Sequence, residues 1–497
     1  YKVKDVQVAG DKLEAIEKVT KKLEIKKSDD FSREKLRHDI DKISKAYMNE
    51  GYAYVEVNPE VKKNPAEVTA EVTYTIDMKE EVHIGRIYIS GNSKTRDKVI
   101  RRELKLSEGD TFNGSKLEKS VLNLKKLDYF EDVEIVPSKT DQKGVMDLHI
   151  KVKEKLTGSV SVGGGFSSDD GLFATGTIVQ RNLFGRGQTL GLKAYLGQDA
   201  SRYVLGFTEP YVLDTSIAAG ADIYNWLREY NDFTKDAVGF KLRTGYPIGN
   251  YTRINSGYIF ENAEISDVIG EAKDIPGLSE GRHIKSSVYT GFERDTTDHP
   301  FLPTKGTVNA VNLEYSAPFL GSDMDFVKTE LRSGVFVPLF WKFVGYARGE
   351  FGYIFALEGE DNVEAYERFF LGGINSLRGF NWGDVAPIDR IPLFDEEGRV
   401  DGHRDVVVGG FKYGLATLEV LFPVIESLGI RGVVFYDAGN VYREDETFDV
   451  MSFRTDAGAG LRWNSPLGPL RIEWGYNLDP QRDEDQYQWQ FSAGAYF

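Results

Sequence analysis

The end of the chain alternates between apolar side chains and polar or small ones. Tyr487, Trp489 and Phe491 are separated by glutamines, and the same alternation runs through residues 471–478 and 238–243. A period of two indicates a β-strand whose two faces meet different surroundings. The apolar face carries aromatic residues near the strand ends, and Lys and Arg fall on the opposite face. This arrangement is typical of the wall of a transmembrane β-barrel.

Turn signals divide residues 157–497 into sixteen strands of this kind. The expected strand cores are 158–168, 171–183, 187–198, 201–211, 215–229, 236–247, 251–264, 283–296, 305–317, 325–338, 342–356, 411–424, 429–442, 453–464, 468–479 and 486–497. An even number suits a single-chain bacterial barrel, and closure of the sheet satisfies every backbone group in lipid. A large soluble β domain is the alternative that the pattern leaves open.

The first 156 residues contain two copies of one unit. Residues 55–57 correspond to residues 133–135, 78 positions later. Each copy predicts the order β-α-α-β-β, a three-stranded sheet under two helices, with an edge strand that another chain can extend. We therefore expect a multi-domain chain: two α+β domains at 1–80 and 81–156, followed by a 16-stranded antiparallel transmembrane β-barrel at 157–497.

Composition supports this division. Residues 1–156 hold 32 Lys+Arg, 30 Asp+Glu and 7 Gly, whereas residues 157–497 hold 30, 48 and 44. The net charge of −16 argues against a nucleic-acid partner. The longest run without a charged residue spans 13 positions, 156–168, and a membrane-spanning helix needs roughly 20.

The sequence offers no reaction centre. Its six histidines are scattered, it has no cysteine, and no histidine pair has the spacing of metal ligands. A nucleophile elbow is also absent. We expect a protein that is not an enzyme, with no catalytic residue, no metal and no cofactor.

One long segment, 357–410, shows no clean strand pattern, and loops of this length inside ordered domains are usually functional. It contains the sequence GGINSLRGF, in which Arg378 precedes Gly379. If this loop folds into the lumen, Arg378 needs a carboxylate partner there. Asp437 falls on the lumen face by alternation, and Glu419 lies on a neighbouring predicted strand. An exposed Arg378 without a partner is the alternative.

Several motifs together carry a family resemblance. They are NSKTRDKVIRRELKLSEGD (92–110), RNLFGRGQTL (181–190), RDTTDHPFLPTKGT (294–307), LRGF (377–380) and the terminal Phe497. The two N-terminal units look like POTRA domains, and the whole chain resembles the BamA family of outer-membrane insertases. Leu377 departs mildly from the family's [VI]RG[FY] motif. Family members usually carry five POTRA domains, so we expect these two to be the penultimate and barrel-proximal ones of a longer protein.

The resemblance implies a protein of the Gram-negative outer membrane, with its POTRA domains in the periplasm. It inserts β-barrel proteins into that membrane. Its implied partners are unfolded outer-membrane β-barrel proteins, accessory assembly lipoproteins and outer-membrane lipid. Leu377, Arg378, Gly379 and Phe380 match the loop motif that contacts the inner wall, with Glu419 and Asp437 as its acidic partners.

The resemblance also implies a lateral gate between the first and last strands. The residues expected there are Gly163, Gly164, Gly165, Phe491, Gly494 and Phe497. Three consecutive glycines leave the first strand few side chains to pack and a weakly specified register. A polypeptide translocation pore of the two-partner secretion type is the alternative function, and a passive porin is a third.

Overall fold

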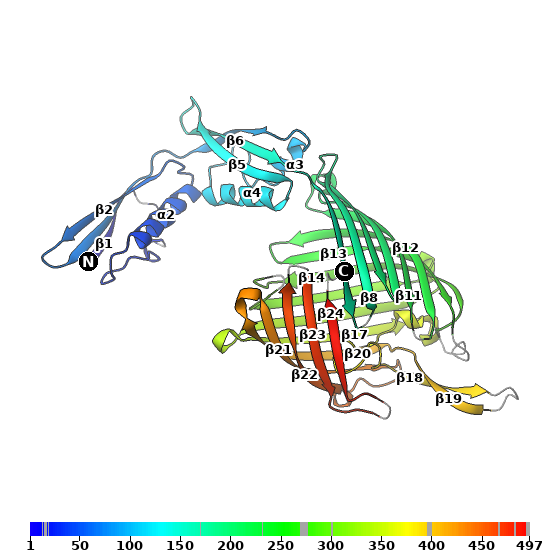
Figure 1. Cartoon of the computed structure of the whole chain (residues 1–497). Helices are drawn as coiled ribbons and strands as arrows, with labels where there is room; N and C mark the ends of the chain where they lie inside the picture. Colours follow the sequence, from blue (N-terminus) through cyan, green and yellow to red (C-terminus); the bar gives the residue numbers. More distant parts are fainter. Residues whose placement is uncertain are drawn as a thin grey trace. The chain divides into compact units, whose positions relative to one another are not determined.

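The chain forms two compact units in the computed structural model (Figure 1). The first contains Tyr1–Thr157 and Arg181–Gly187, and the second contains Gly158–Gln180 and Gln188–Phe497. The structure describes every residue except 12, 14–16, 18, 169, 231, 269–276, 300–301, 395–399, 466–467, 482–483 and 494–497. Within the described residues, no helix has the length and apolar character needed to cross a membrane.

The first repeat contains a three-stranded sheet with the order β1-β3-β2. Its elements are β1 (Lys2–Gly10), α2 (Arg33–Asn49), β2 (Glu56–Asn64) and β3 (Thr69–Asp77). Ser32 caps α2 by accepting a hydrogen bond from the Lys35 backbone N–H. Ile43 and Tyr47 of α2 are buried against Tyr74 of β3. The other predicted helix of this repeat falls largely outside the described residues.

The second repeat has the corresponding sheet order, β4-β6-β5. Its elements are β4 (His83–Ser90), α3 (Asp97–Arg101), α4 (Gly114–Lys126), β5 (Phe130–Lys139) and β6 (Val145–Glu154). In both repeats the first strand is parallel to the central strand and the remaining strand is antiparallel to it. The predicted α+β repeat is confirmed.

Two of the sequence motifs meet in this first unit. The Glu154 carboxylate accepts hydrogen bonds from the backbone N–H groups of Lys94 and Thr95 and from the Ser93 hydroxyl. Burial opposes its ionisation, but these donors outweigh burial and lower the pKa of Glu154 to about 2. The Asn182 side chain donates to the Thr95 hydroxyl oxygen at 2.8 Å. Segment 181–187 is therefore an integral part of the first unit.

The second unit is a closed barrel of sixteen antiparallel strands, counted over the residues that the structure describes. They are β7 (Gly158–Ser167), β8 (Gly171–Leu183), β9 (Gln188–Gly197), β10 (Ala200–Glu209), β11 (Ala218–Glu229), β12 (Thr234–Ile248), β13 (Thr252–Ser266), β14 (Gly281–Asp295), β15 (Gly306–Ser316), β16 (Phe326–Pro338), β17 (Val344–Ala356), β20 (Lys412–Ile425), β21 (Ile430–Tyr442), β22 (Arg454–Ser465), β23 (Gly468–Asn477) and β24 (Tyr487–Ala493). The predicted fold class is confirmed.

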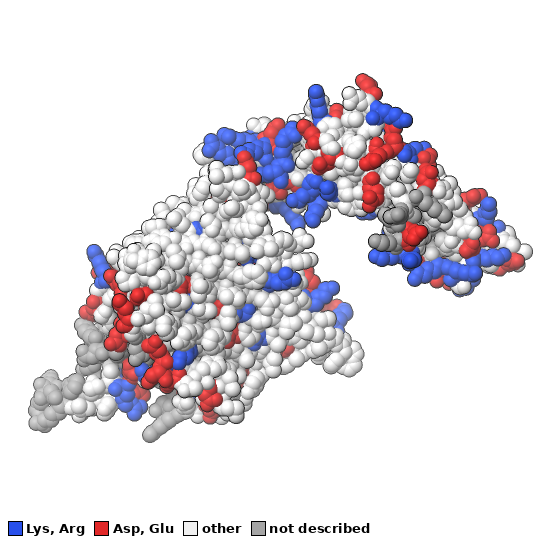
Figure 2. Space-filling view, turned by 180° about the vertical axis from the view of Figure 1, so that it is seen from behind, with Lys and Arg blue, Asp and Glu red and all other residues white. Residues whose placement is uncertain are grey.

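The barrel wall separates apolar from polar side chains as the alternation predicts. On β12, Val238, Phe240 and Leu242 are exposed on the outside, whereas Ala237 and Lys235 are buried. Figure 2 shows a barrel surface that is largely free of charged side chains in this view, with its charges gathered mainly toward one end. The first unit carries charges of both signs over its surface. The barrel surface is therefore suited to contact lipid, and the first unit to contact water.

The expectation that segment 357–410 contains no strand is wrong. It holds a two-stranded hairpin of β18 (Ile388–Phe394) and β19 (Val400–Val407). Its cross-strand pair Arg390–Asp405 is exposed on both partners. Ile391 of β18 and Val406 of β19 are buried in an apolar cluster with Phe233 and Ile265, so the hairpin is packed at these positions. Pro392 interrupts the strand pattern of β18 in the sequence.

Candidate functional site

The long loop between β17 and β20 is packed into the barrel through its motif residues. Leu377 and Phe380 are 0% and 3% exposed, and both belong to a buried cluster with Phe326 and Phe411. This apolar cluster fixes the loop tip among residues of β16 and β20. The structure therefore places the motif in the lumen of the barrel, against the inner face of the wall.

Arg378 is held on the inner wall by three carboxylates from three strands. Its Nε and Nη2 donate to the two oxygens of Asp437 at 2.7 and 2.8 Å. Its Nη1 donates to Glu419 at 2.7 Å and to Glu473 at 2.8 Å. The guanidinium also lies 3.5 Å from the centre of the Phe435 ring. Arg378 and Asp437 are 2% and 0% exposed, so the pair lies in a low-dielectric site where its hydrogen bonds are strong.

The structure thus brings Arg378 together with Glu419 and Asp437 and adds three residues that the sequence analysis missed. Glu473 and Arg471 lie on β23, and Arg462 lies on β22. Arg462 donates to both Glu419 and Glu473, at 2.6 to 2.8 Å. Their signal in the sequence is the inward position within the alternation, because Ile472 and Trp474 face outward. Alternation gives the face of a strand but not which neighbours meet across the lumen.

The base of the loop is held on a different part of the wall. Glu367 accepts a hydrogen bond from Lys285 of β14 at 2.7 Å, and its backbone carbonyl accepts one from Lys328 of β16 at 2.8 Å. Glu364 pairs with His283 of β14 at 2.9 Å. The loop therefore spans the lumen from β14 and β16 to the wall formed by β20–β23.

The seam between the first and last strands is sparsely paired. β7 pairs with β8 at ten positions and β24 pairs with β23 at seven, but β24 and β7 share the single pair Ser492↔Ser167 among the described residues. Three further hydrogen bonds join Phe491 to Ser168. The Ser168 N–H and hydroxyl donate to the Phe491 carbonyl at 3.1 and 3.4 Å, and the Phe491 N–H donates to the Ser168 hydroxyl oxygen at 2.7 Å.

The glycines of β7 lie beside this seam. A Cβ atom on Gly165 would lie 1.8 Å from the carbonyl oxygen of Ala493 on β24, so the two backbones approach closely there. Gly163 and Gly164 face atoms of β8 instead, at 3.0 and 3.1 Å. Phe491 contacts Phe166 edge-to-face, with ring centres 6.4 Å apart. The other two expected gate residues, Gly494 and Phe497, lie outside the described residues.

The motif at 294–307 forms the turn between β14 and β15. Asp298 organises it by accepting hydrogen bonds from the Thr304 and Lys305 backbone N–H groups. Arg431 of β21 reaches the turn and donates to the carbonyl oxygens of Leu302 and Pro303, each at 3.4 Å. Because β15, β16, β17 and β20 precede β21 in the barrel order, this turn crosses the ends of the intervening strands.

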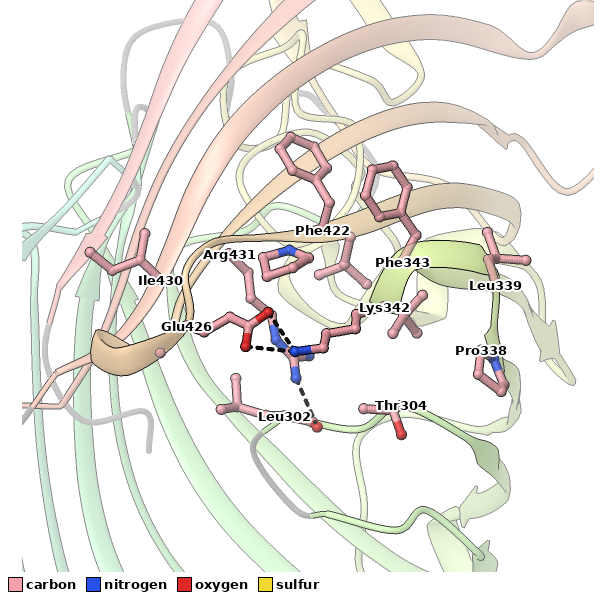
Figure 3. A pocket seen from close by; sticks show the side chains of 14 residues that line it. Leu302, Thr304, Pro338, Leu339, Lys342, Phe343, Phe422, Glu426, Ile430 and Arg431 are labelled. Atoms are coloured by element: carbon pink, nitrogen blue, oxygen red, sulfur yellow. Dashed lines mark hydrogen bonds and ion pairs between the residues drawn. The ribbon is translucent and has the colours of Figure 1, made fainter.

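A pocket of about 410 Å³ lies beside this turn (Figure 3). Most of its lining is apolar, including Leu302, Phe343 and Phe422. Of its charged lining residues, Lys342 and Glu426 pair with each other at 2.7 Å. The pocket therefore presents an apolar surface with its charges already engaged. Across the described part of the chain, no three His, Cys, Asp or Glu side chains are grouped so as to hold a metal ion.

Comparison with known proteins places this architecture in a family. Residues 182–497 match the Omp85 superfamily domain, and residues 1–79 and 82–155 match the POTRA family described as a surface antigen variable number repeat. The outer membrane protein assembly factor BamA of Nitratidesulfovibrio vulgaris is 33% identical over 100% of this chain and 62% of its own length. The chain thus spans less than two thirds of that relative.

Solved structures show the same fold. BamA from Haemophilus ducreyi lacking POTRA domains 1–3 has a TM-score of 0.82 at 23% identity, covering 99% of both chains. CdiB from Escherichia coli is more distant, with a TM-score of 0.56 at 15% identity, covering 99% of this chain and 89% of its own.

The chain therefore belongs to the Omp85 superfamily, whose barrel here follows two POTRA repeats. Within that superfamily it is a BamA-type protein. Its barrel lies in the bacterial outer membrane and its POTRA domains lie in the periplasm.

Proposed function

We propose that this chain is the membrane end of an insertase that folds β-barrel proteins into the outer membrane. The observation that carries the proposal is the unequal pairing of β24, which has seven partners on β23 and one on β7 among the residues that the structure describes. A strand edge with free N–H and C=O groups is a template for another strand. The seam between β7 and β24 is then the lateral gate, with the glycines of β7 and Phe491 lining it.

The client chain enters from the periplasm. β2 and β5 lie at the edges of the two POTRA sheets, where an unfolded chain adds by strand pairing. The seam then opens and templates new strands until the client closes on itself. Burial of the client's apolar face in lipid is favourable by itself, so the process uses no catalytic residue, cofactor or metal. Accessory assembly lipoproteins are proposed partners of the periplasmic repeats.

The loop motif does not open in this proposal but holds neighbouring strands of the wall together. Arg378, with Glu419 and Asp437, holds β20 and β21 to the loop tip, and Glu473 extends that hold to β23. We assign these residues the role of keeping the wall next to the gate intact while the gate opens.

Reconstitution in liposomes tests this function. An unfolded small β-barrel protein is added to vesicles with and without the chain, and its folding is followed by heat-modifiable gel mobility. We expect faster folding in the vesicles that contain the chain. Equal rates in both preparations would contradict the insertase proposal.

A secretion pore of the two-partner type is the second candidate, because POTRA repeats followed by a sixteen-stranded barrel fit it as well. The loop that spans the lumen favours the insertase, since it occupies the path that a translocated chain would use. Planar bilayers separate the two functions: a pore conducts steadily, whereas an insertase of this design shows no sustained conductance.

A further inference from the structure

The last strand carries a buried amide on its lumen face. Gln490 of β24 is 2% exposed, whereas the outward residues Tyr487 and Trp489 of the same strand are 58% and 53% exposed. The Gln490 Nε2 donates to the backbone carbonyl of Phe380 at 2.9 Å. Phe380 is the final residue of the loop motif, so the loop tip contacts the gate strand directly.

The carbonyl that receives this bond is a fixed point. Arg378, two residues earlier, is bound by Glu419, Asp437 and Glu473. The tip also lies tightly against β23, since a Cβ atom on Gly475 would lie 2.5 Å from the carbonyl carbon of Arg378. The loop tip cannot follow β24 if that strand moves, because three other strands hold it.

Gln490 lies next to the residue that closes the seam. Phe491 makes the hydrogen bonds to Ser168, and Gln490 makes the bond to the loop. Two adjacent residues of β24 therefore contact the loop tip and the end of β7, respectively. The Gln490 Oε1 is buried and has no hydrogen-bond partner among the described residues. The side chain is thus held to the loop by one bond, and breaking that bond frees it.

We propose that Gln490 is a positioning residue that couples the loop motif to the lateral gate. Its bond to Phe380 holds β24 where Phe491 meets Ser168, and its loss lets β24 move away from β7. This inference rests on the proposed gate, but it concerns the resting position of the seam and needs no client.

The test measures the seam in proteoliposomes without client. Nitroxide labels on Ser167→Cys and Ser492→Cys report closure through dipolar broadening, and the chain has no other cysteine. Gln490→Met keeps the length of the side chain and removes the donor. We expect the ratio of closed to open seams to fall about two- to tenfold, the effect of one ordinary hydrogen bond. Heat-modifiable gel mobility confirms that the compared samples are folded.

Two further variants sharpen the test. Gln488→Met changes the same face of β24 at a residue that bonds to Asp485 rather than to the loop, so it should leave closure unchanged. Gln490→Glu should open the seam while ionised and close it again on acidification, because the protonated acid regains a donor. If the Gln490→Met variant does not fold, the closure of the Gln490→Glu seam on acidification still tests the proposal.

Parent-like closure in folded Gln490→Met, or equal loss in Gln488→Met, overturns the assignment. The gate itself is judged separately by client insertion. Suppose that the Gln490 variants alter the seam but a barrel locked by a disulfide between positions 167 and 492 still inserts clients. The positioning role of Gln490 would then stand, and the proposed gate would be rejected.

Discussion

The barrel wall around the loop tip and the seam between β24 and β7 are held together by very different numbers of contacts. Around the loop tip, one guanidinium makes four short hydrogen bonds to carboxylates on β20, β21 and β23, all of them buried. At the seam, the described residues of β24 and β7 form one pair, at the end of β7. The difference teaches that the strong contacts are concentrated beside the proposed gate rather than across it. A wall built this way can part at one line and keep its shape elsewhere.

Locking the seam should have the largest effect. Residues 167 and 492 are direct partners on antiparallel strands, a spacing that a disulfide spans. We expect the oxidised Ser167→Cys/Ser492→Cys variant to lose client insertion in liposomes and to regain it on reduction. Each single-cysteine variant is the control. Full insertion by the oxidised form would mean that the seam does not open during function.

Removing the Arg378 guanidinium should weaken the well-bonded wall around the loop tip. Arg378→Ala leaves three buried carboxylates with one cation fewer, and loss of one partner of a buried ion pair costs about 3–5 kcal/mol. We expect the temperature of heat-induced unfolding, read from gel mobility, to fall well below that of the parent. Arg390→Ala, which breaks an exposed pair with Asp405, should change it little. Equal stability of the two variants would refute the central role of Arg378.

A methyl group at Gly165 should weaken the seam. The added Cβ meets the Ala493 backbone oxygen, and overpacking of this kind costs about 1–3 kcal/mol. Gly165→Ala should therefore reduce the yield of the disulfide between positions 167 and 492 under equilibrium oxidation. Gly163→Ala is the matched control, because among the described residues its methyl group meets only the Thr175 side chain on β8. The same yield from both variants would show that the close approach at Gly165 does not set the seam.

The smallest effect belongs to the aromatic pair that bridges the seam. Phe166 and Phe491 meet edge-to-face, an arrangement worth about 0.5–1.5 kcal/mol beyond the area buried. A double-mutant cycle with Phe166→Leu and Phe491→Leu, read by the same disulfide yield, should return a coupling energy in that range. A coupling energy of zero would mean that the contact between Phe166 and Phe491 does not stabilise the seam.

The sequence predicted the wall better than its interior. Alternation placed all sixteen strands, and it put Asp437 on the inward face, because the pleat of a strand is a local property. Glu473 and Arg462 were missed because their meeting depends on the register of β22 and β23 and on how far the loop reaches. Gln490 showed the inward position in the same way, but nothing in the sequence indicates that its amide reaches the Phe380 carbonyl.

The loop that spans the lumen has a consequence for the integrity of the cell envelope. Its base is fixed on β14 and β16 and its tip on β20, β21 and β23, and none of these contacts involves β7. In the proposed gate, the first strand would therefore be released while the loop stays in place. In the proposed gate, the opening would face sideways into lipid rather than through the lumen, so an outer membrane that carries many such proteins would keep its barrier to small solutes and ions.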